Sequence, residues 1–445
     1  MGVTEELITF VLDTGWYDFP DAVVARAKEL VIDFVGGALG GTETSVGRIL
    51  TEYIQEKDAK PEAGVIGKNL RTTAGYAAYV NGVFNHATEL EAVSQRTSPN
   101  PLAVIAVSLS MGEKLGRSGK EILEALILGF EMQGRVGGAS LQGVKKGRIS
   151  IFNHLGAAAA ASKLMKLEVY QARMALGIAA FQAGGLITNV GTMAHVLELP
   201  VAARDGIEAA ELAQRGCTAH PDIIEAPQGF CDALIEEGSY DTEEMTKALG
   251  ETFQVVNPGI SIKQYPCCYR SHRALDALFD LMAEHSITYH SVEKVTVDIN
   301  LYDSYLMKFP DPKTGEEAKF SYPHIFGAAI MKGKVWVNSF TDESVVDHQY
   351  EEARKKIEVV IHPEWPTSRV DARAPVTIAL KDGRKFSKEL DTPREPTMEE
   401  LFTRYREAAD GVLTSDQTEK SLDLLLKMEN LKDVSEVMNL LVFRM

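Results

Sequence analysis

The run Gly156–Ala161 (GAAAAA), inside Asn153–Leu167 (NHLGAAAAASKLMKL), predicts a helix that a neighbouring helix can approach closely. Its side chains are too small to hold two helix axes apart, so tight helix packing is the simplest explanation of the run. On both sides of it, apolar residues recur every three or four positions, which indicates further helices. These stretches are 20–40, 72–88, 101–115, 120–136 and 200–215. No alternating strand pattern stands out before residue 260.

Glycines are the expected helix ends in this part of the chain, because glycine adopts the backbone conformation that closes a helix. The positions are Gly116 with Gly119, Gly177 and Gly216. Stops at these points would leave short connections, which suits a compact helical domain.

The pattern changes past residue 285. Lys294–Asn300 (KVTVDIN) alternates apolar and polar residues, and Lys356–His362 (KIEVVIH) is rich in β-branched residues, as strands are. Pro375–Leu380 and Arg384–Leu390 flank Asp382-Gly383, a strong signal for a hairpin turn. These residues therefore predict a sheet of mixed, mainly antiparallel character.

Helical periodicity returns at Thr397, which follows Pro396 and opens a plausible capped helix. A chain of 445 residues is also long enough for two domains. We expect a mostly α fold with a large helical domain, residues 1–262 completed by 397–445, and a smaller inserted α+β domain, residues 263–396. The inserted domain should contain a helix over Lys319–Lys332. Such an insertion leaves a cleft at the domain junction, a usual place for a small-molecule site.

The charge balance excludes several classes of partner. The chain has 46 basic and 63 acidic residues, a formal net charge of -17. Nucleic acid is not expected to bind, because phosphate recognition needs a concentrated basic surface. The first residues show no signal-peptide or myristoylation pattern, and no apolar stretch reaches about 18 residues. We therefore expect a cytoplasmic protein with no membrane partner.

Motifs for common cofactors are absent from the sequence. There is no phosphate-binding glycine loop, no G-x-S-x-G and no H-x-H or H-E-x-x-H pair, so nucleotide, serine hydrolase and zinc chemistry lack support. The cysteines include no Cys-x-x-Cys pair, and adjacent cysteines chelate metals poorly. They are Cys217, Cys231, Cys267 and Cys268. We expect free thiols in a reducing compartment, no metal and no cofactor.

Three segments carry candidate site residues, and the first is Lys263–Arg273 (KQYPCCYRSHR). It concentrates basic side chains in an acidic chain, and arginine binds carboxylates in a bidentate manner. The residues are Lys263, Arg270, His272 and Arg273, and Tyr265 adds a hydroxyl. The segment predicts a carboxylate-binding site, or else an exposed basic face at the start of a helix over 271–285.

The second segment, Asn85–Pro101, combines His86, Glu89 and Glu91 with a loop that contains Ser98. Burial raises the pKa of a carboxylate, so a buried Glu89 would be a suitable proton acceptor. The alternative is that these are exposed polar residues at a helix end.

The third segment, Gly191–Arg204, places His195 and Glu198 three residues apart. On a helix that spacing brings both side chains to one face. A histidine paired with a carboxylate suits general-base catalysis at neutral pH. The simpler alternative is a helix-end histidine whose hydrogen bonds are satisfied.

Six segments, in order along nearly the whole chain, together resemble the MmgE/PrpD family. They are AAYVNGVFNHATELEA, KEILEALILGFEM, NHLGAAAAASKLMKL, GTMAHVLELPVAARDGIEAAELAQRGCTA, IKQYPCCYRSHRALDAL and AKFSYPHIFGAAIMKGKV. The family includes 2-methylcitrate dehydratase, cis-aconitate decarboxylase and iminodisuccinate epimerase. The resemblance implies a helical domain that takes up the C-terminal helices, an α+β lid, a homodimer and catalysis without an obligatory cofactor.

Some family positions are kept in this chain. Lys263 in K-x-Y-P-C-C matches the family's basic residue, and His272 matches the histidine after the double cysteine. Glu89 and Glu91 take two acidic positions of the family's D-F-D-D-T, each with a side chain one methylene longer.

Other positions depart from the family pattern. Ser98 stands where the family has the histidine of T-H-P-S. His195 and Glu198 replace the lysine and histidine of T-K-P-L-H. In F-S-x-P-Y the serine is kept as Ser321, but the tyrosine has become His324. The resemblance therefore implies that the acids and bases of the site are largely rebuilt.

These observations lead us to predict a cofactor-independent lyase, of the dehydratase type, that removes a proton next to a carboxylate of a small di- or tricarboxylate. His195 is the predicted base and Glu198 its orienting partner. Glu89, His272 and His324 are the other candidate catalytic residues. The candidate substrate-binding residues are Lys263, Tyr265, Arg270, Arg273, Ser98 and Ser321.

Two alternatives remain open at the level of sequence. One is an epimerase or isomerase in which His195 and His324 act as two bases on opposite faces of a carboxylate substrate. The other is a non-catalytic homologue that binds a metabolite.

Overall fold

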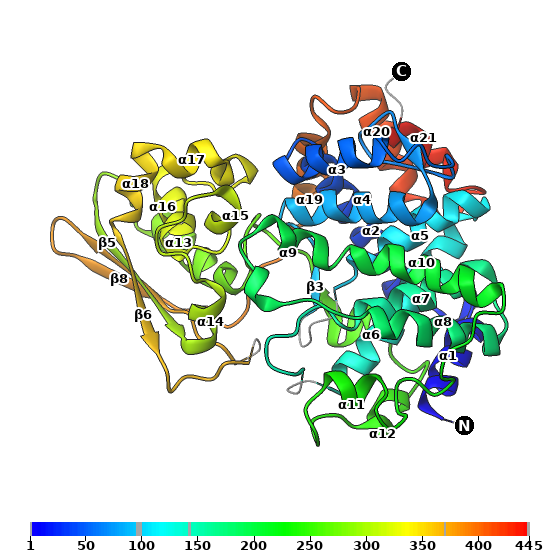
Figure 1. Cartoon of the computed structure of the whole chain (residues 1–445). Coiled ribbons are helices and arrows are strands. Elements are labelled where there is room, and N and C mark those ends of the chain that lie inside the picture. Colours follow the sequence, from blue (N-terminus) through cyan, green and yellow to red (C-terminus); the bar gives the residue numbers. More distant parts are fainter. Residues whose placement is uncertain (1, 95–99, 141–143, 369–370, 443–445) are drawn as a thin grey trace. The chain divides into compact units, whose positions relative to one another are not determined.

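The computed structural model describes residues 2–94, 100–140, 144–368 and 371–442, and it divides into two compact units (Figure 1). Unit 1 comprises Met1–Thr188, His195–Ile262 and Thr397–Met445, and unit 2 comprises Asn189–Ala194 and Lys263–Pro396. Unit 1 is built from helices, whereas unit 2 contains a four-stranded sheet with helices. This confirms the predicted fold class, mostly α with an α+β part.

Unit 1 is dominated by seven long helices among its described residues. They are α2 (Asp21–Gly41), α4 (Ala74–Ala87), α5 (Leu102–Leu115), α6 (Gly119–Gly138), α7 (Asn153–Met165), α8 (Val169–Gln182) and α10 (Val201–Gln214). Helices α2, α4, α5, α6 and α10 coincide with the five predicted periodic stretches, α7 contains the alanine-rich run, and α8 lies outside both predictions. Shorter helices complete its N-terminal part: α1 (Val3–Asp13), α3 (Ser45–Gln55), α11 (Phe230–Leu234) and α12 (Thr242–Thr246). Searched over the described residues, the helices include none with the length and apolar character needed to cross a bilayer.

Close packing through small side chains, predicted for Gly156–Ala161, is confirmed where α7 meets α6. A Cβ added at Gly156 would lie 2.2 Å from Oε1 of Gln133 and 2.8 Å from the carbonyl oxygen of Gly129. A Cβ added at Gly129 would in turn lie 2.8 Å from the Cβ of Ala160. There is no room at this contact for even a methyl group, so the two helices depend on glycine here.

The helix stop predicted at Gly177 is wrong, because α8 continues through this residue to Gln182. A Cβ at Gly177 would lie 2.5 Å from the Cβ of Ala219, so the glycine makes room for a neighbouring segment. Gly116 ends α5 with φ 60°, and Gly216 follows α10 with φ 95°, as predicted, whereas Gly119 is the first residue of α6 rather than a helix end.

Strands before residue 262 are two residues long where the structure describes them. They pair as β1 (Ala63–Gly64) with β2 (Arg71–Thr72), and β3 (Val93–Ser94) with β4 (Ile260–Ser261), both antiparallel. Through the second pair, the chain that follows α4 is hydrogen-bonded to Ile260–Ser261, near the end of the N-terminal part of unit 1.

The C-terminal helices α19 (Met398–Ala409), α20 (Ser415–Leu426) and α21 (Ser435–Val442) belong to unit 1. The predicted capped start is confirmed, since Thr397 and Glu400 form a capping box. Arg404 lies 2.9 Å from Asp33 of α2, and both side chains are largely buried. Figure 1 shows these helices, in orange and red, beside the blue helices of the N-terminal part.

Unit 2 holds a sheet with the strand order β6-β5-β7-β8. The strands are β5 (Val292–Asn300), β6 (Ile357–His362), β7 (Val376–Leu380) and β8 (Lys385–Lys388). β5 pairs with β6 in parallel and with β7 antiparallel, and β7 pairs antiparallel with β8. The predicted strands and the hairpin at Asp382-Gly383 are confirmed, and Gly383 supplies the positive φ of 88°.

One face of this sheet is apolar and the other is polar. Val295, Val297 and Ile378 are fully buried, and helices α13 (His272–Glu284) and α16 (Tyr322–Lys332) pack against the strands. Asp298 of β5 points to the other face of the sheet, where its carboxylate accepts a hydrogen bond from His362 at 2.7 Å. The period-two pattern in the sequence thus corresponds to one covered face.

The helix predicted over Lys319–Lys332 begins later than expected. Helix α15 (Gly315–Ala318) ends just before this stretch, and Ser321 then caps α16, whose first residue is Tyr322. The remaining helices of unit 2 are α14 (Leu301–Leu306), α17 (Asp342–Val346) and α18 (His348–Arg354).

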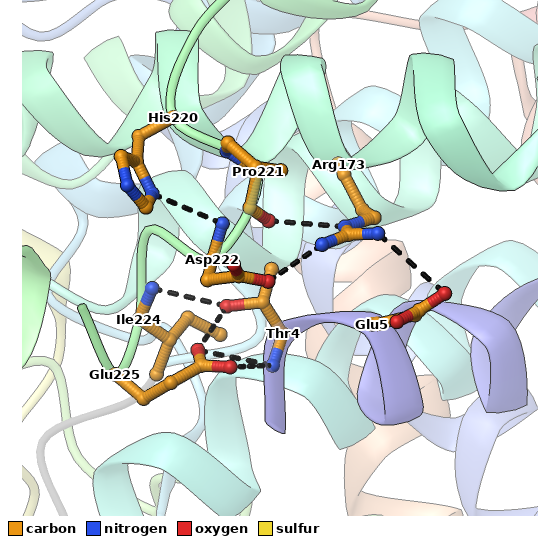
Figure 2. Close-up of polar contacts among 8 residues, drawn as sticks. All are labelled: Thr4, Glu5, Arg173, His220, Pro221, Asp222, Ile224 and Glu225. Atoms are coloured by element: carbon orange, nitrogen blue, oxygen red, sulfur yellow. Dashed lines mark hydrogen bonds and ion pairs between the residues drawn. The ribbon is translucent and has the colours of Figure 1, made fainter. Parts of the chain in front are cut away.

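Figure 2 shows how the N-terminal helix α1 is tied to the segment before α11. The backbone N–H of Thr4 donates to both carboxylate oxygens of Glu225 at 3.2 Å, and the Thr4 hydroxyl also donates to Glu225. The same hydroxyl accepts from the N–H of Ile224 at 3.1 Å. Arg173 of α8 pairs with Asp222 at 2.5 Å, so three segments distant in sequence meet in one network.

We expect Gly156→Ala to lower the free energy of unfolding by about 1–3 kcal/mol, because the added methyl group overpacks the α6–α7 contact. The matched control is Gly75→Ala in α4, where the nearest atom to the new Cβ would be 3.5 Å away. That control should be neutral or stabilising by up to about 1 kcal/mol. Urea unfolding followed by circular dichroism measures both, and equal effects would contradict the packing argument.

We expect Glu225→Ala to lower stability by about 1–3 kcal/mol, since it removes the acceptor of the Thr4 backbone and hydroxyl donors. Glu237→Ala, at an exposed position after α11, is the control. Thermal melting of both variants checks this. An unchanged melting temperature for Glu225→Ala would show that the network in Figure 2 adds nothing to stability.

Candidate active site

The described part of unit 1 brings His195 together with His86 and Glu89, which lie more than 100 residues earlier in the chain, and all three side chains are buried. One donor atom from each lies within 4.8 Å of the other two. The rings of His86 and His195 meet edge to face, with their centroids 5.1 Å apart. We call these three residues the α4-end cluster.

The end of α4 positions this cluster through a close helix contact. A Cβ at Gly82 would lie 2.9 Å from the Cβ of Pro200, so the start of α10 rests directly on α4. The short helix α9 (Met193–Glu198) immediately precedes that contact. His86, in the last turn of α4, donates from Nδ1 to the carbonyl oxygen of Val196 at 3.0 Å.

Glu89 follows the C-cap residue of α4, Thr88, with a left-handed backbone, φ 55°. Its N–H donates to the carbonyl oxygen of His86 at 2.9 Å, and its side chain is buried. This conformation costs a residue other than glycine of the order of 1 kcal/mol, and such strain often marks a functional position. Burial of Glu89, one condition of its predicted role as proton acceptor, is therefore met.

The predicted meeting of His195 and Glu198 on one helix is confirmed. Nδ1 of His195 lies 3.4 Å from Oε2 of Glu198, and both side chains are largely buried. The other carboxylate oxygen accepts from the N–H of Leu186 at 3.0 Å. Glu198 is thus fixed at both oxygens, and it holds the imidazole in one orientation.

In unit 2, the arginines of Lys263–Arg273 contact groups of their own unit. Arg270 lies 3.1 Å from Asp303 and 4.9 Å above the ring of Tyr302. Arg273, largely buried, donates to the carbonyl oxygen of Ala372. These contacts brace the loops of unit 2, so they weaken the case that either arginine binds substrate.

Tyr265 and His272 are similarly engaged. The Tyr265 hydroxyl donates to Asp276 at 2.7 Å, and burial, together with that carboxylate, raises the pKa of Tyr265 well above its usual value. Nε2 of His272 donates to the carbonyl oxygen of Cys267 at 3.2 Å. The rings of Tyr265 and Tyr269 each lie 5.1 Å from the His272 ring.

Lys263 is among the largest fully buried side chains, with 1 % of its surface exposed. It follows the last residue of β4, Ser261, by two positions along the chain. A buried ammonium is costly unless anionic or polar groups surround it. The burial of Lys263 is thus established, and its predicted role in carboxylate binding stays a prediction.

His324 lies in the core of unit 2 and is not exposed. Nε2 donates to the carbonyl oxygen of Ser339 at 2.7 Å, Nδ1 lies 3.2 Å from Arg354, and the ring stacks on Tyr350. Burial lowers the pKa of His324 to about 4; the bond to Ser339 opposes the shift and Arg354 adds to it. A neutral, fully enclosed ring fits a structural role better than the predicted role of acid.

The two serines have different outcomes. Ser321 is fully buried and caps α16 by accepting from the N–H of His324 at 3.2 Å, which accounts for its presence without a ligand. Ser98 lies outside the described residues.

His86 belongs to the second candidate segment, but the sequence does not single it out as a catalytic residue. The signal available for it was the spacing His86-x-x-Glu89 at the end of a predicted helix, because three residues bring both to one side. Its meeting with His195 depends on helix packing, which no local pattern reveals.

The lowered pKa of His324 predicts a pH dependence of stability. The ordinary pKa is 6.5, so between pH 6.5 and about 4 the unfolded chain binds a proton that the folded unit does not. The contribution of His324 is complete above pH 6.5 and is lost as the pH falls towards 4, by on the order of 3 kcal/mol.

Urea midpoints measured at pH 7 and pH 5 should therefore differ less in His324→Gln than in the unchanged protein. His348→Gln, a substitution at an exposed histidine of the same unit, should keep the full difference. An identical pH dependence in the protein with and without His324 would rule out this effect.

Two family models and several curated relatives match this chain, and together the matches cover nearly its whole length. The MmgE/PrpD N-terminal domain model matches residues 5–243, and the MmgE/PrpD C-terminal domain model matches residues 265–430. The chain is 28% identical over 461 residues to cis-aconitate decarboxylase of Mus musculus, with 99% of this chain and 93% of that protein covered.

Two further relatives carry similar names. Identity is 27% over 461 residues to cis-aconitate decarboxylase of Homo sapiens, covering 99% and 94% of the two chains. It is 27% over 472 residues to the cis-aconitate decarboxylase-like protein oryM of Aspergillus oryzae, covering 99% and 97%. With both family models matched in order over most of its length, the chain belongs to the MmgE/PrpD family.

Proposed function

We propose that this protein is a lyase that acts on a small di- or tricarboxylate by removing a proton from the carbon next to a carboxylate. The observation that carries the proposal is the buried pair of His195 and Glu198 beside His86 and Glu89, in a member of the MmgE/PrpD family. Because two relatives are named cis-aconitate decarboxylase, we rank tricarboxylates first among the candidate substrates.

His195 is the proposed base. Its Nδ1–H points to Glu198, so the neutral ring carries its lone pair on Nε2. The carboxylate also stabilises the imidazolium that forms when Nε2 accepts the substrate proton. As that C–H bond breaks, its electron pair forms the carbon–carbon double bond, and the leaving group departs from the neighbouring carbon with its own bonding pair.

Cationic groups must stabilise the negative charge that develops on the substrate carboxylate during this step. Lys263, Arg270 and Arg273 stay the predicted residues for this role, and among them Lys263 is the most deeply buried. Homodimer formation and a cytoplasmic location stay predictions.

Proton NMR of the EDTA-treated protein in deuterated water, with a panel of carboxylates, tests the proposal. The panel comprises citrate, methylcitrate, malate, tartrate, cis-aconitate and N-substituted aspartates. New vinyl signals from a saturated acid support this proposal. Loss of cis-aconitate with a new alkene product would support a lyase that releases CO₂ and adds a proton to carbon, and would contradict proton removal as the chemical step. Loss of an α-proton signal without a new alkene would instead support the epimerase alternative, and an unchanged panel would favour the metabolite-binding homologue.

With a substrate in hand, His195→Gln should lower kcat by about 100-fold to 10,000-fold, the usual contribution of a general base. Glu198→Gln should cause a smaller loss, since it removes orientation and charge but leaves the base in place. His220→Gln, at an exposed histidine of the same unit, is the control and should keep full activity. A near-normal rate for His195→Gln with intact circular dichroism would remove this residue from the mechanism.

A further inference from the structure

We propose that His86, Glu89 and His195, the α4-end cluster, form a binding site for a divalent transition-metal ion of the zinc class. Two imidazoles and one carboxylate are a donor set that zinc accepts, with a further coordination position left for water or another ligand. No local sequence pattern indicates such a site, because the ligands come from the end of α4 and from α9.

The spacing of the three donors is close to what a metal needs. One atom from each residue lies within 4.8 Å of the others. Zinc–ligand distances of about 2.0–2.2 Å put the donors of a tetrahedral site roughly 3.4 Å apart. Binding must therefore draw the donors together by about 1 Å or somewhat more, a movement within the reach of side-chain rotation.

The hydrogen bonds at the far side of both rings have the arrangement of an outer coordination shell. His86 donates from Nδ1 to the carbonyl oxygen of Val196, and the Nδ1 of His195 faces the Glu198 carboxylate. Each bond places the ring proton on Nδ1, which leaves the lone pair on Nε2 as the metal ligand. Metal-binding histidines nearly always donate their other N–H in this way, to a carbonyl or a carboxylate.

The electrostatic setting favours a cation at this point. The cluster lies at the C-terminal end of α4, where the helix dipole places partial negative charge. Glu89 adds a buried carboxylate there in a strained left-handed backbone, and Glu91 is buried two residues later. The chain as a whole has a net charge of -17, which raises the local concentration of cations.

This inference deepens the proposed function and in one respect rests on it. A metal ion bound to Nε2 of His195 uses the lone pair that the base needs, so metal binding and proton abstraction exclude each other. The bound metal would thus inhibit the proposed lyase, and the cluster would act as a metal-sensitive control of the same site.

The test measures metal binding to the purified full chain in the absence of substrate. After EDTA treatment and dialysis, Co²⁺ is added as a spectroscopic probe and Zn²⁺ is titrated by calorimetry. We expect one Zn²⁺ to bind per chain. Bound Co²⁺ should show a visible absorption band with the intensity typical of four or five ligands, and added Zn²⁺ should remove this band by displacing Co²⁺.

Three variants assign the site. His86→Asn and Glu89→Gln should each weaken Zn²⁺ binding by at least about 100-fold, because each removes a ligand. Glu198→Gln should weaken it by about 10- to 100-fold, as expected for an outer-shell partner. His220→Gln, at an exposed histidine, should bind Zn²⁺ as the unchanged protein does, and circular dichroism checks that all the variants are folded.

His195→Lys tests the third ligand of the metal site. Because Zn²⁺ binding is measured without substrate, the metal site and the lyase activity can fail independently. The lysine keeps a basic nitrogen but is a poor zinc ligand at neutral pH, so Zn²⁺ binding should fall by at least about 100-fold. Absence of one-to-one binding, or equal affinity in the folded His86→Asn and Glu89→Gln variants, would overturn the metal site and leave the lyase proposal standing. Tight Zn²⁺ binding at the cluster without turnover of any carboxylate would support the metal site and contradict the lyase proposal.

Discussion

The close approach of α4 to the α9–α10 junction is the constraint on which the candidate site depends. Gly82 lets Pro200 rest on the backbone of α4, and the bond from His86 to the carbonyl oxygen of Val196 fixes the junction in register. Two histidines from separate segments are thereby brought edge to face in a buried place. A larger residue at position 82 would push these helices apart and disperse the cluster.

Much of the fold was predictable because it rests on local patterns. The capping residues around Thr397, the Asp382-Gly383 turn and the alternation in β5 each follow from chemistry within a few residues. Gly177 shows the limit of such reasoning. A glycine that makes room for a distant segment looks, in the sequence, like one that ends a helix.

The site was predictable only in part. The pairing of His195 with Glu198 follows from helical spacing, whereas His86 and Val196 are 110 residues apart and meet through packing alone. The basic segment after residue 263 looked like a carboxylate-binding set, yet Arg270 contacts a carboxylate of its own unit. A sequence shows the charges available for a site, but the structure shows which of them are already engaged by the fold.

A crystal structure with tricarballylate bound is the sharpest test of a reactive centre at the end of α4. This tricarboxylate has no hydroxyl group to eliminate, so it should remain intact in the site. We expect one of its CH₂ carbons, next to a terminal carboxylate, to lie within about 3.5 Å of Nε2 of His195. A well-ordered tricarballylate elsewhere in the protein, with no contact to His195 or Glu89, would rule out a reactive centre at the end of α4.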